Sequence, residues 1–158
     1  MEVPQPLIDD IGSGKCLPFI GAGFSLNSRI SDGRQMPDWQ TLTERLAKVA
    51  NVSAELGGPS VASYFEKKFG RVQLIEAIRM ALCIGHVEPG EAHKAFVDLP
   101  FDTIYTTNFD LLLEDAFTFA HKPFRSLAGD KQMSFHGGPL DINIIKMHGD
   151  LRHEEYIV

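Results

Sequence analysis

Three short apolar stretches of this chain each run directly into a small polar cluster, and this repeated order is the feature that most constrains the fold. Residues 16–20 (CLPFI) lead into GAGFS, residues 101–107 lead into Asn-Phe-Asp, and residues 141–147 lead into His-Gly-Asp. Short apolar runs rich in β-branched and aromatic residues are typical of buried strands. Helical patterns separate the three runs. The alternation predicts an α/β, Rossmann-like domain with a parallel sheet and helices on both faces.

The segments between the strands carry the spacing and the end signals of helices. Asp38 is a good N-cap for a helix that opens at residues 37–39, because Leu42, Leu46 and Val49 follow at helical spacing. We expect further helices over residues 6–11, 60–69, 72–84, 91–99 and 110–120, a short strand over 124–127, and a loop over 26–36. The strand at 16–20 is expected to be buried on both faces.

Charge and cysteine content restrict the classes of function. The chain has 158 residues, a net charge of -6 and no clustering of its basic residues, so we expect no direct nucleic-acid binding and no anionic membrane surface as a partner. No apolar run is long enough to cross a bilayer, and the amino terminus lacks a signal-peptide pattern. Cys16 and Cys83 lie far apart, without C-x-x-C metal spacing, and are expected to be reduced. These features predict a cytoplasmic protein.

The carboxyl end has the pattern of a strand that stops early. Residues 155–158 (EYIV) begin like a β-strand, whose backbone groups need neighbours. We therefore expect residues 1–158 to be the amino-terminal part of a nucleotide-binding domain that is truncated at its carboxyl end.

The three polar clusters are expected to meet in one crevice. In an open parallel sheet, ligands bind outside the carboxyl ends of the strands, and each cluster follows such an end. The glycines of GAGFS permit a tight turn and a close approach of backbone N–H groups to a pyrophosphate. A Gly-x-Gly at a strand end is by itself more often an ordinary turn. The acidic residue at dinucleotide-fingerprint spacing, Glu44, falls on a predicted helix, so this is not the ordinary dehydrogenase pattern.

The second and third clusters each allow a structural interpretation as well. Asn108 or Asp110 is expected to cap the helix that follows them. A lone histidine such as His148 is more often a structural residue than a catalytic one. Trp39 is expected to serve as a buried staple at a helix start rather than as a wall of the ligand pocket. The ordered combination of all three clusters carries more information than any one of them.

That combination resembles the sirtuin family. The forms found here are GAGFS, TTNFD and KMHGD, with MPDW between the first two, and they look like the divergent bacterial sirtuin-like branch that hydrolyses NAD. The resemblance extends from Pro18 to Asp150. The resemblance places Pro37-Asp38-Trp39 where deacylating sirtuins have a Pro-Asp-Phe-Arg segment. Gln40 stands in place of the arginine of that segment. The resemblance implies NAD as substrate and assigns roles to seven residues: Gly21, Ala22, Gly23 and Ser25 would hold the NAD phosphates, Asn108 would contact the ribose next to nicotinamide and help to position a water, Asp110 would face the carboxamide, and His148 would act as general base.

The chemistry of NAD cleavage suits these residue types. Nicotinamide leaves as a neutral base, so the reaction needs no general acid, and its transition state is oxocarbenium-like. The protein must supply orientation, dipoles and a base for water, which an Asn amide, an Asp carboxylate and a His imidazole provide. No metal is expected. The predicted function is NAD hydrolysis, with the NAD-depleting effector of a bacterial antiphage defence system as its implied setting.

Two alternative functions remain open on the sequence. An NAD-dependent protein deacylase of the sirtuin family would carry a zinc module of two C-x-x-C pairs after the HG motif, and residues 151–158 contain no cysteine. A non-catalytic nucleotide-binding module would keep the glycine turn but would need neither Asn108 nor His148. An NAD-depleting effector must be held inactive until it is triggered, so we expect a sensor domain or a partner protein to control it. We also expect a homo-oligomer.

Overall fold

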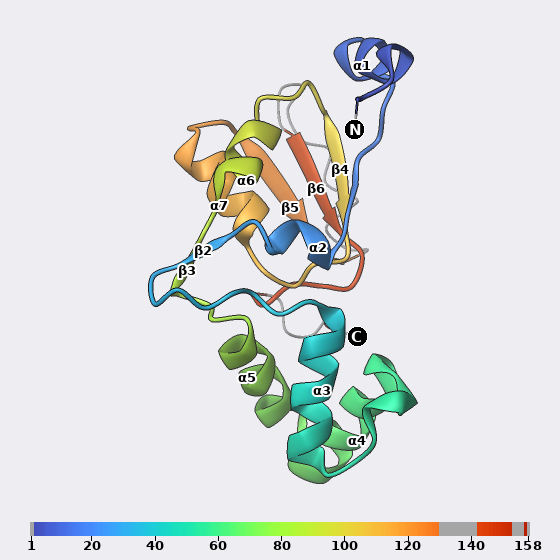
Figure 1. Ribbon diagram of the computed structural model, residues 1–158, viewed down its shortest axis with the longest axis vertical. Helices are drawn as coiled ribbons and strands as arrows, with labels where there is room; N and C mark the ends of the chain where they lie inside the picture. The colour runs from blue at the N-terminus through green and yellow to red at the C-terminus, as the bar shows by residue number, and fades with distance from the viewer. Residues whose placement is uncertain (1, 130–141, 153–156, 158) are drawn as a thin grey trace.

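The computed structural model describes residues 2–129, 142–152 and 157 of the chain (Figure 1). The helices are α1 (Gln5–Gly12), α2 (Ala22–Ser25), α3 (Trp39–Ala50), α4 (Gly58–Phe69), α5 (Arg71–Ala81), α6 (Glu91–Phe96) and α7 (Leu112–Phe119), with a 3-10 turn η1 (Ala54–Leu56). The strands are β1 (Phe19–Ile20), β2 (Arg29–Ile30), β3 (Val87–Glu88), β4 (Thr103–Thr106), β5 (Phe124–Leu127) and β6 (Ile142–Lys146). The predicted α/β class, with a parallel sheet flanked by helices, is confirmed.

Four strands form a parallel sheet in the order β1-β4-β6-β5. The register pairs Ile20 with Thr106 and Thr106 with Lys146, so the last residues of β1, β4 and β6 lie side by side. The segments that follow these residues therefore leave the sheet at the same edge. This register produces the expected meeting of the three clusters.

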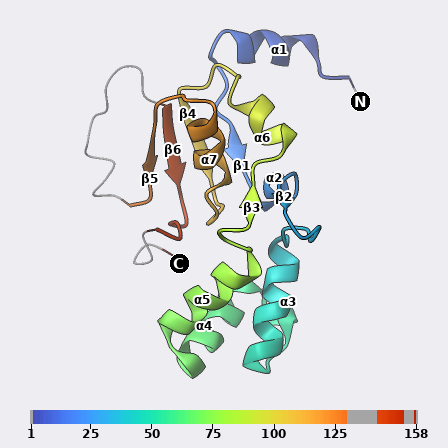
Figure 2. The same cartoon turned by 90° about the vertical axis from the view of Figure 1, so that its left-hand side faces the viewer.

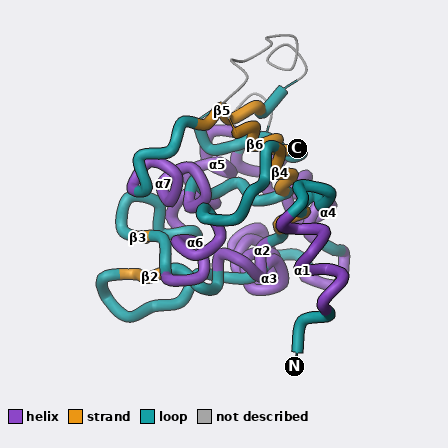
Figure 3. The backbone as a smooth tube through the Cα atoms, turned by 90° about the horizontal axis from the view of Figure 1, so that it is seen from above, coloured by secondary structure: helices purple, strands orange, loops and turns teal. Residues whose placement is uncertain are grey.

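One face of the sheet packs against helices. Figure 3 shows α2, α6 and α7 on the same side of β4, β5 and β6. The core between these layers includes Ile104 and Ile144 from the sheet and Leu113 and Phe117 from α7. α7 forms here because its apolar residues recur at helical spacing and bury one stripe against the strands.

The strand at residues 16–20 differs from the prediction. Only Phe19 and Ile20 pair as β1, which is an edge strand of the described sheet, and the Phe19 side chain is 62% exposed. The expectation that this strand is buried on both faces is therefore wrong. Burial of an apolar run depends on the position of the strand in the sheet, and strand order is a tertiary property.

Three helices, α3, α4 and α5, form a second group beyond the carboxyl ends of the strands (Figure 2). Asp38 caps α3 as predicted, since its carboxylate accepts the Thr41 backbone N–H at 2.7 Å. A glycine with φ of +92°, Gly70, separates α4 from α5 and permits the sharp change of direction. The group has its own core, which includes Leu46, Val61, Phe65 and Ile75.

A two-stranded antiparallel ribbon, β2 with β3, connects the segment after α2 to the segment after α5. The prediction of a loop over residues 26–36 missed β2, because two residues are too few to produce a period-2 pattern. Gly90, just after β3, is needed for the close approach of these segments. A Cβ at this position would lie 1.7 Å from the Asn27 carbonyl oxygen.

The remaining predicted elements agree with the structure to within a few residues. β5 has the predicted bounds, whereas α5 and α6 end three residues early and α7 begins two residues late. Helix α1 forms where predicted. Within the described ranges, no helix combines the length and apolar character needed to cross a membrane. The predicted strand start at residues 155–158 lies mostly outside the described residues.

Candidate active site

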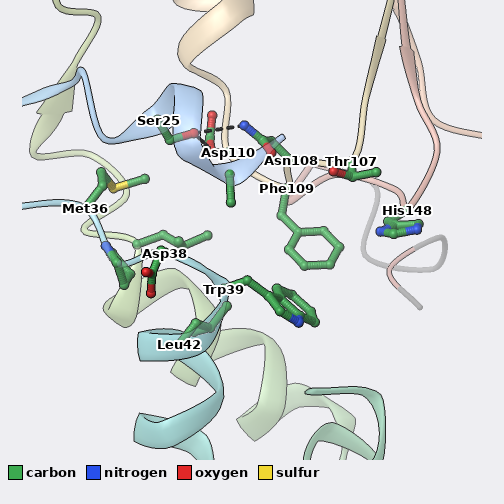
Figure 4. A pocket seen from close by; sticks show the side chains of 13 residues that line it. Ser25, Met36, Asp38, Trp39, Leu42, Thr107, Asn108, Phe109, Asp110 and His148 are labelled. Carbon is green, nitrogen blue, oxygen red and sulfur yellow. Dashed lines mark hydrogen bonds between the residues drawn. The ribbon is translucent and has the colours of Figure 1, made fainter. Parts of the chain in front are cut away.

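The three strand ends open onto one cavity of about 280 Å³ (Figure 4). Ala22 and Ser25 come from the segment after β1, residues 107–110 come from the segment after β4, and His148 comes from the turn after β6. Residues 36–39, Leu42 and Leu82 form the side of the cavity toward the helical group. The structure thus brings His148 to the same cavity as Asn108.

Asn108 is held by the glycine turn. Its side-chain amide nitrogen donates to the Gly21 carbonyl at 3.2 Å and to the Ser25 hydroxyl at 2.9 Å, and its backbone N–H donates to Thr106 Oγ1. The residue is only 8% exposed, and Oδ1 is buried without a hydrogen-bond partner among the described residues. A buried amide oxygen without a partner is unfavourable by about 1–3 kcal/mol. A ligand hydroxyl or a water that donates to Oδ1 would remove this cost.

Asp110 orients the residues around it. One carboxylate oxygen accepts the Ser25 hydroxyl at 2.7 Å, and the other accepts the Leu112 backbone N–H at 3.1 Å at the start of α7. The N-cap of α7 is Leu111, which makes no side-chain cap hydrogen bond, so the expectation that Asn108 or Asp110 takes this position is wrong; Asp110 instead forms an Asx turn just before the helix. Ser25 receives a hydrogen bond from Asn108 and donates one to Asp110, so the three side chains form one chain of hydrogen bonds.

The glycines of GAGFS are not required by the packing of the protein. A Cβ at Gly21 or Gly23 would meet no atom within 4 Å, and neither residue has a positive φ. Gly21 contributes its carbonyl to Asn108, while Ala22 and Ser25 line the cavity. The fold does not explain why side chains are absent at Gly21 and Gly23. The surface of this turn is therefore open to close approach from outside the fold.

His148 occupies a turn that follows β6. Gly149, with φ of +80°, donates its N–H to the Lys146 carbonyl and closes this turn. The imidazole is exposed, and its ring centre lies 6.4 Å from that of Phe109. In Figure 4, His148 lies across Phe109 from Asn108, so the two polar groups border an aromatic surface.

An apolar wall, which sequence reasoning largely missed, completes the cavity. It contains Met36, Leu42, Leu82, Phe109 and Trp39. Trp39 is 46% exposed and its ring lies 6.2 Å from that of Phe109, so the interpretation of Trp39 as a buried staple is wrong. The indole packs over Gly58 of α4, where an added Cβ would lie 2.4 Å from it. No local pattern in the sequence indicates this contact, because α3 and α4 bring the two residues together.

A buried histidine lies behind the glycine turn. His93 of α6 is fully buried, contacts the Phe24 ring at 4.5 Å, and accepts the Gly90 N–H on Nδ1. Its Nε2 is buried without a partner among the described residues. Burial lowers the pKa of His93 below its ordinary value of 6.5, and the nearby Asp110 carboxylate opposes this shift. The folded protein therefore favours the neutral form of His93 more than the unfolded chain does.

Acidification is expected to destabilise the protein through His93. As the pH falls below about 6.5, His93 takes up a proton more readily in the unfolded chain than in the folded protein, so the free energy of unfolding decreases as the pH falls. This contribution is fully present above the unfolded pKa. His93→Asn keeps an acceptor for the Gly90 N–H but cannot titrate. Urea unfolding at pH 7.5 and 5.5 should show a smaller loss of stability for this variant than for the wild type. Equal losses of stability in the variant and the wild type would contradict a contribution of His93 to the pH dependence.

The described residues at the cavity include no cluster of metal ligands. Among residues 2–129, 142–152 and 157, the structure holds no group of three or more His, Cys, Asp or Glu side chains arranged to bind a metal ion. Cys16 is partly buried and Cys83 is buried, and both are free thiols.

Comparisons with known proteins agree with the motifs. Residues 102–158 match the family model of the SIR2-like domain. The chain is 30% identical over 138 residues to the NAD(+) hydrolase ThsA of Bacillus cereus (strain MSX-D12), and the match covers 85% of this chain and 28% of that protein. It is 28% identical over 135 residues to the NAD(+) hydrolase ThsA of Cytobacillus dafuensis, covering 84% of this chain and 26% of that protein. The protein of the same name from Enterococcus faecium is 26% identical over 144 residues, and the match covers 89% of this chain and 29% of that protein.

These findings confirm the resemblance to sirtuin-like proteins, which was inferred from GAGFS, TTNFD and KMHGD. The chain spans just over a quarter of the length of the curated relatives that it matches. The family match covers β4, α7, β5 and β6, and so includes Asn108, Asp110 and His148 but not the glycine turn.

Proposed function

We propose that this sirtuin-like chain, with its match to the SIR2-like domain, binds NAD in the described cavity and hydrolyses the nicotinamide–ribose bond. The observation that carries the proposal is that Ser25, Asn108 and His148, from three separate strand ends, line the same cavity. The names of the relatives support the same reaction.

The reaction needs few groups from the protein. The bond between ribose C1′ and the nicotinamide nitrogen breaks, and its electron pair neutralises the positive charge of the ring. The oxygen of a water bonds to C1′, and a base accepts the proton that this water loses. The products are nicotinamide, ADP-ribose and one proton. Asn108 Oδ1, which is buried without a protein partner, is suited to accept a hydrogen bond from a ribose hydroxyl or from the attacking water.

His148 is proposed as the base that accepts the proton. Its imidazole is exposed at the cavity, so it can release the proton to solvent after each turnover. Asp110 and Ser25 would hold the Asn108 amide in one orientation, and Asp110 would also face the carboxamide. The turn formed by Gly21, Ala22, Gly23 and Ser25 is proposed to contact the phosphates. The proposal requires no metal.

Deacylation is the alternative that an experiment must separate from hydrolysis. The full-length gene product is incubated with NAD, and the products are separated by chromatography. We expect nicotinamide and ADP-ribose in equal amounts without any acylated peptide, and about 100-fold slower release from Asn108→Ala. Release that requires an acylated peptide would identify a deacylase instead. NAD binding without any release, including after activation, would leave a non-catalytic nucleotide-binding module.

Gly23→Ala is expected to weaken NAD binding without destabilising the fold. An added methyl group meets no protein atom, but it would crowd a ligand that approaches the turn. We expect Kd for NAD to rise about tenfold and Tm to stay within about 2 °C of the wild type. Gly12→Ala at the end of α1 is the matched control, because its Cβ also meets nothing and it lies away from the cavity. Calorimetric titration measures both variants, and unchanged affinity in Gly23→Ala would contradict the proposed phosphate contact.

The proposed setting follows from the resemblance to the divergent bacterial branch. We propose that residues 1–158 are the amino-terminal part of an NAD-binding domain in a cytoplasmic effector of antiphage defence. Depletion of NAD harms the cell that produces the effector, so the activity of the effector must be suppressed before infection. A homo-oligomer with a sensor domain or a partner protein is the proposed means of control.

A further inference from the structure

A buried charged cluster lies beside the proposed site, and no step of the proposed reaction uses it. We define the Glu114 cluster as Glu114 of α7, Lys146 at the end of β6, and Asp150 and Arg152 beyond the His148 turn. Glu114 Oε1 accepts from Lys146 Nζ at 3.1 Å and from Arg152 Nη2 at 3.2 Å. Arg152 also lies 3.3 Å from the Asp150 carboxylate.

The burial of this cluster requires an explanation. Glu114, Lys146 and Asp150 are nearly inaccessible to solvent, and removing such charges from water costs several kcal/mol per ion before pairing. Apolar side chains of similar volume could join α7 to β6 at equal or lower cost. Stability alone therefore gives a weak reason for the cluster. Its members instead lie at positions that fix one particular turn.

The cluster holds both ends of the turn that carries His148. Lys146 precedes His148 by two residues, and Asp150 follows it by two. Glu114 is linked directly to Lys146, and through Arg152 to Asp150. Lys146 Nζ also donates to the backbone carbonyl of Asp110, within the segment that carries Asn108.

Backbone hydrogen bonds attach the same turn to the Asn108 segment. Met147 N–H donates to the Thr106 carbonyl at 2.9 Å, and Leu151 N–H donates to the Phe109 carbonyl at 3.3 Å. The backbone on either side of His148 is therefore fixed against the backbone on either side of Asn108. The Glu114 cluster stabilises this arrangement from behind, since neither Glu114 nor Lys146 lines the cavity.

We propose that Glu114 is a positioning residue, which sets the geometry between His148 and Asn108 by holding Lys146 and Arg152. The inference rests on the proposed function and deepens it. Glu114 does not line the cavity and has no proposed contact with the substrate. It acts only through the placement of His148, and a displacement of about 1 Å of a catalytic group is enough to slow a reaction about 100-fold.

Two variants weaken the cluster to different degrees. Arg152→Met removes a side chain that is 44% exposed and leaves the Glu114–Lys146 pair intact, so this variant is expected to fold. Glu114→Gln keeps an acceptor oxygen but removes the charge between the two cations. Glu91→Gln is the matched control, because exposed Glu91 also pairs with two cations, Arg29 and Lys94, away from the cavity.

Hydrogen exchange gives a readout that does not depend on activity. In Arg152→Met and Glu114→Gln, the amides of Met147, Gly149 and Leu151 are expected to exchange about tenfold faster, while those of Ile104 and Ile144 in the sheet stay within about twofold of the wild type. Exchange that accelerates equally in the sheet, or nowhere, would overturn the positioning role. Glu91→Gln should change neither set of amides.

A kinetic cycle with His148→Ala tests whether the cluster acts through His148. We expect Arg152→Met to lower kcat for NAD hydrolysis about tenfold with KM unchanged, and to have less than a twofold effect in the His148→Ala background. Equal effects in both backgrounds would overturn the inference. A wild type that releases no nicotinamide would instead refute the proposed function, and the exchange result would still decide whether the cluster holds the turn.

Discussion

Replacing His148 with alanine is expected to lower kcat for NAD hydrolysis by about 10² to 10⁴, the range that general-base catalysis contributes in enzymes. Kd for NAD should change by less than about threefold, because the proposed phosphate and ribose contacts lie on Gly23, Ser25 and Asn108. The turn should keep its shape, since Gly149 and the Glu114 cluster are unaffected. Single-turnover nicotinamide release, followed beside calorimetric titration, separates the chemical step from binding.

An exposed histidine on another element provides the control for this experiment. His86 lies between α5 and β3 and does not line the cavity, so His86→Ala should retain the wild-type rate. If His148→Ala hydrolyses NAD as fast as His86→Ala, the imidazole is not the base. Water or another group would then have to accept the proton.

The largest effect on stability is expected from breaking the buried pair of Glu114 and Lys146. Glu114→Leu leaves the Lys146 ammonium buried without its carboxylate, which should lower the free energy of unfolding by about 3–5 kcal/mol. The double variant Glu114→Leu/Lys146→Met removes both charges and should recover most of that loss. Urea unfolding of the wild type, the single variants and the double variant measures the coupling between the two positions.

The surface pair of Glu91 and Arg29 is the reference for this cycle. Both side chains are mostly exposed, so Glu91→Leu should change the free energy of unfolding by less than about 1 kcal/mol. A Glu114→Leu variant that loses no more than Glu91→Leu would show that solvent or another group compensates Lys146. The description of a tightly paired buried cluster would then be incorrect.

The sequence alone identified most of the elements that position the site. Asp38 and the leucines that follow it predicted α3, because an N-cap and a helical apolar spacing are both local signals. The runs before Asn108 and His148 predicted β4 and β6 for the same reason. We predicted that β4 and β6 end at the same edge of the sheet, because this is a general property of parallel strands. The pairing of Thr106 with Lys146 confirms it.

Features that depend on tertiary contacts could not be predicted in this way. Phe19 has the apolar character of a buried strand residue, yet β1 is an edge strand of the described sheet. Lys146 interrupts an apolar strand and could have been recognised as unusual, but its partner Glu114 is 32 residues away in the sequence. Ser25 and Asp110 are 85 residues apart, so their hydrogen bond is visible only in the structure.

The contact of Trp39 with Gly58 has a consequence for how such a cavity can change. The indole forms part of the cavity wall, and its position depends on the absence of a side chain at Gly58 of α4. A larger residue at position 58 would collide with the ring and displace it, because a Cβ there would already lie 2.4 Å from the indole. A substitution in α4 can therefore change the shape of this cavity while Asn108 and His148, which lie on other segments, keep their identity.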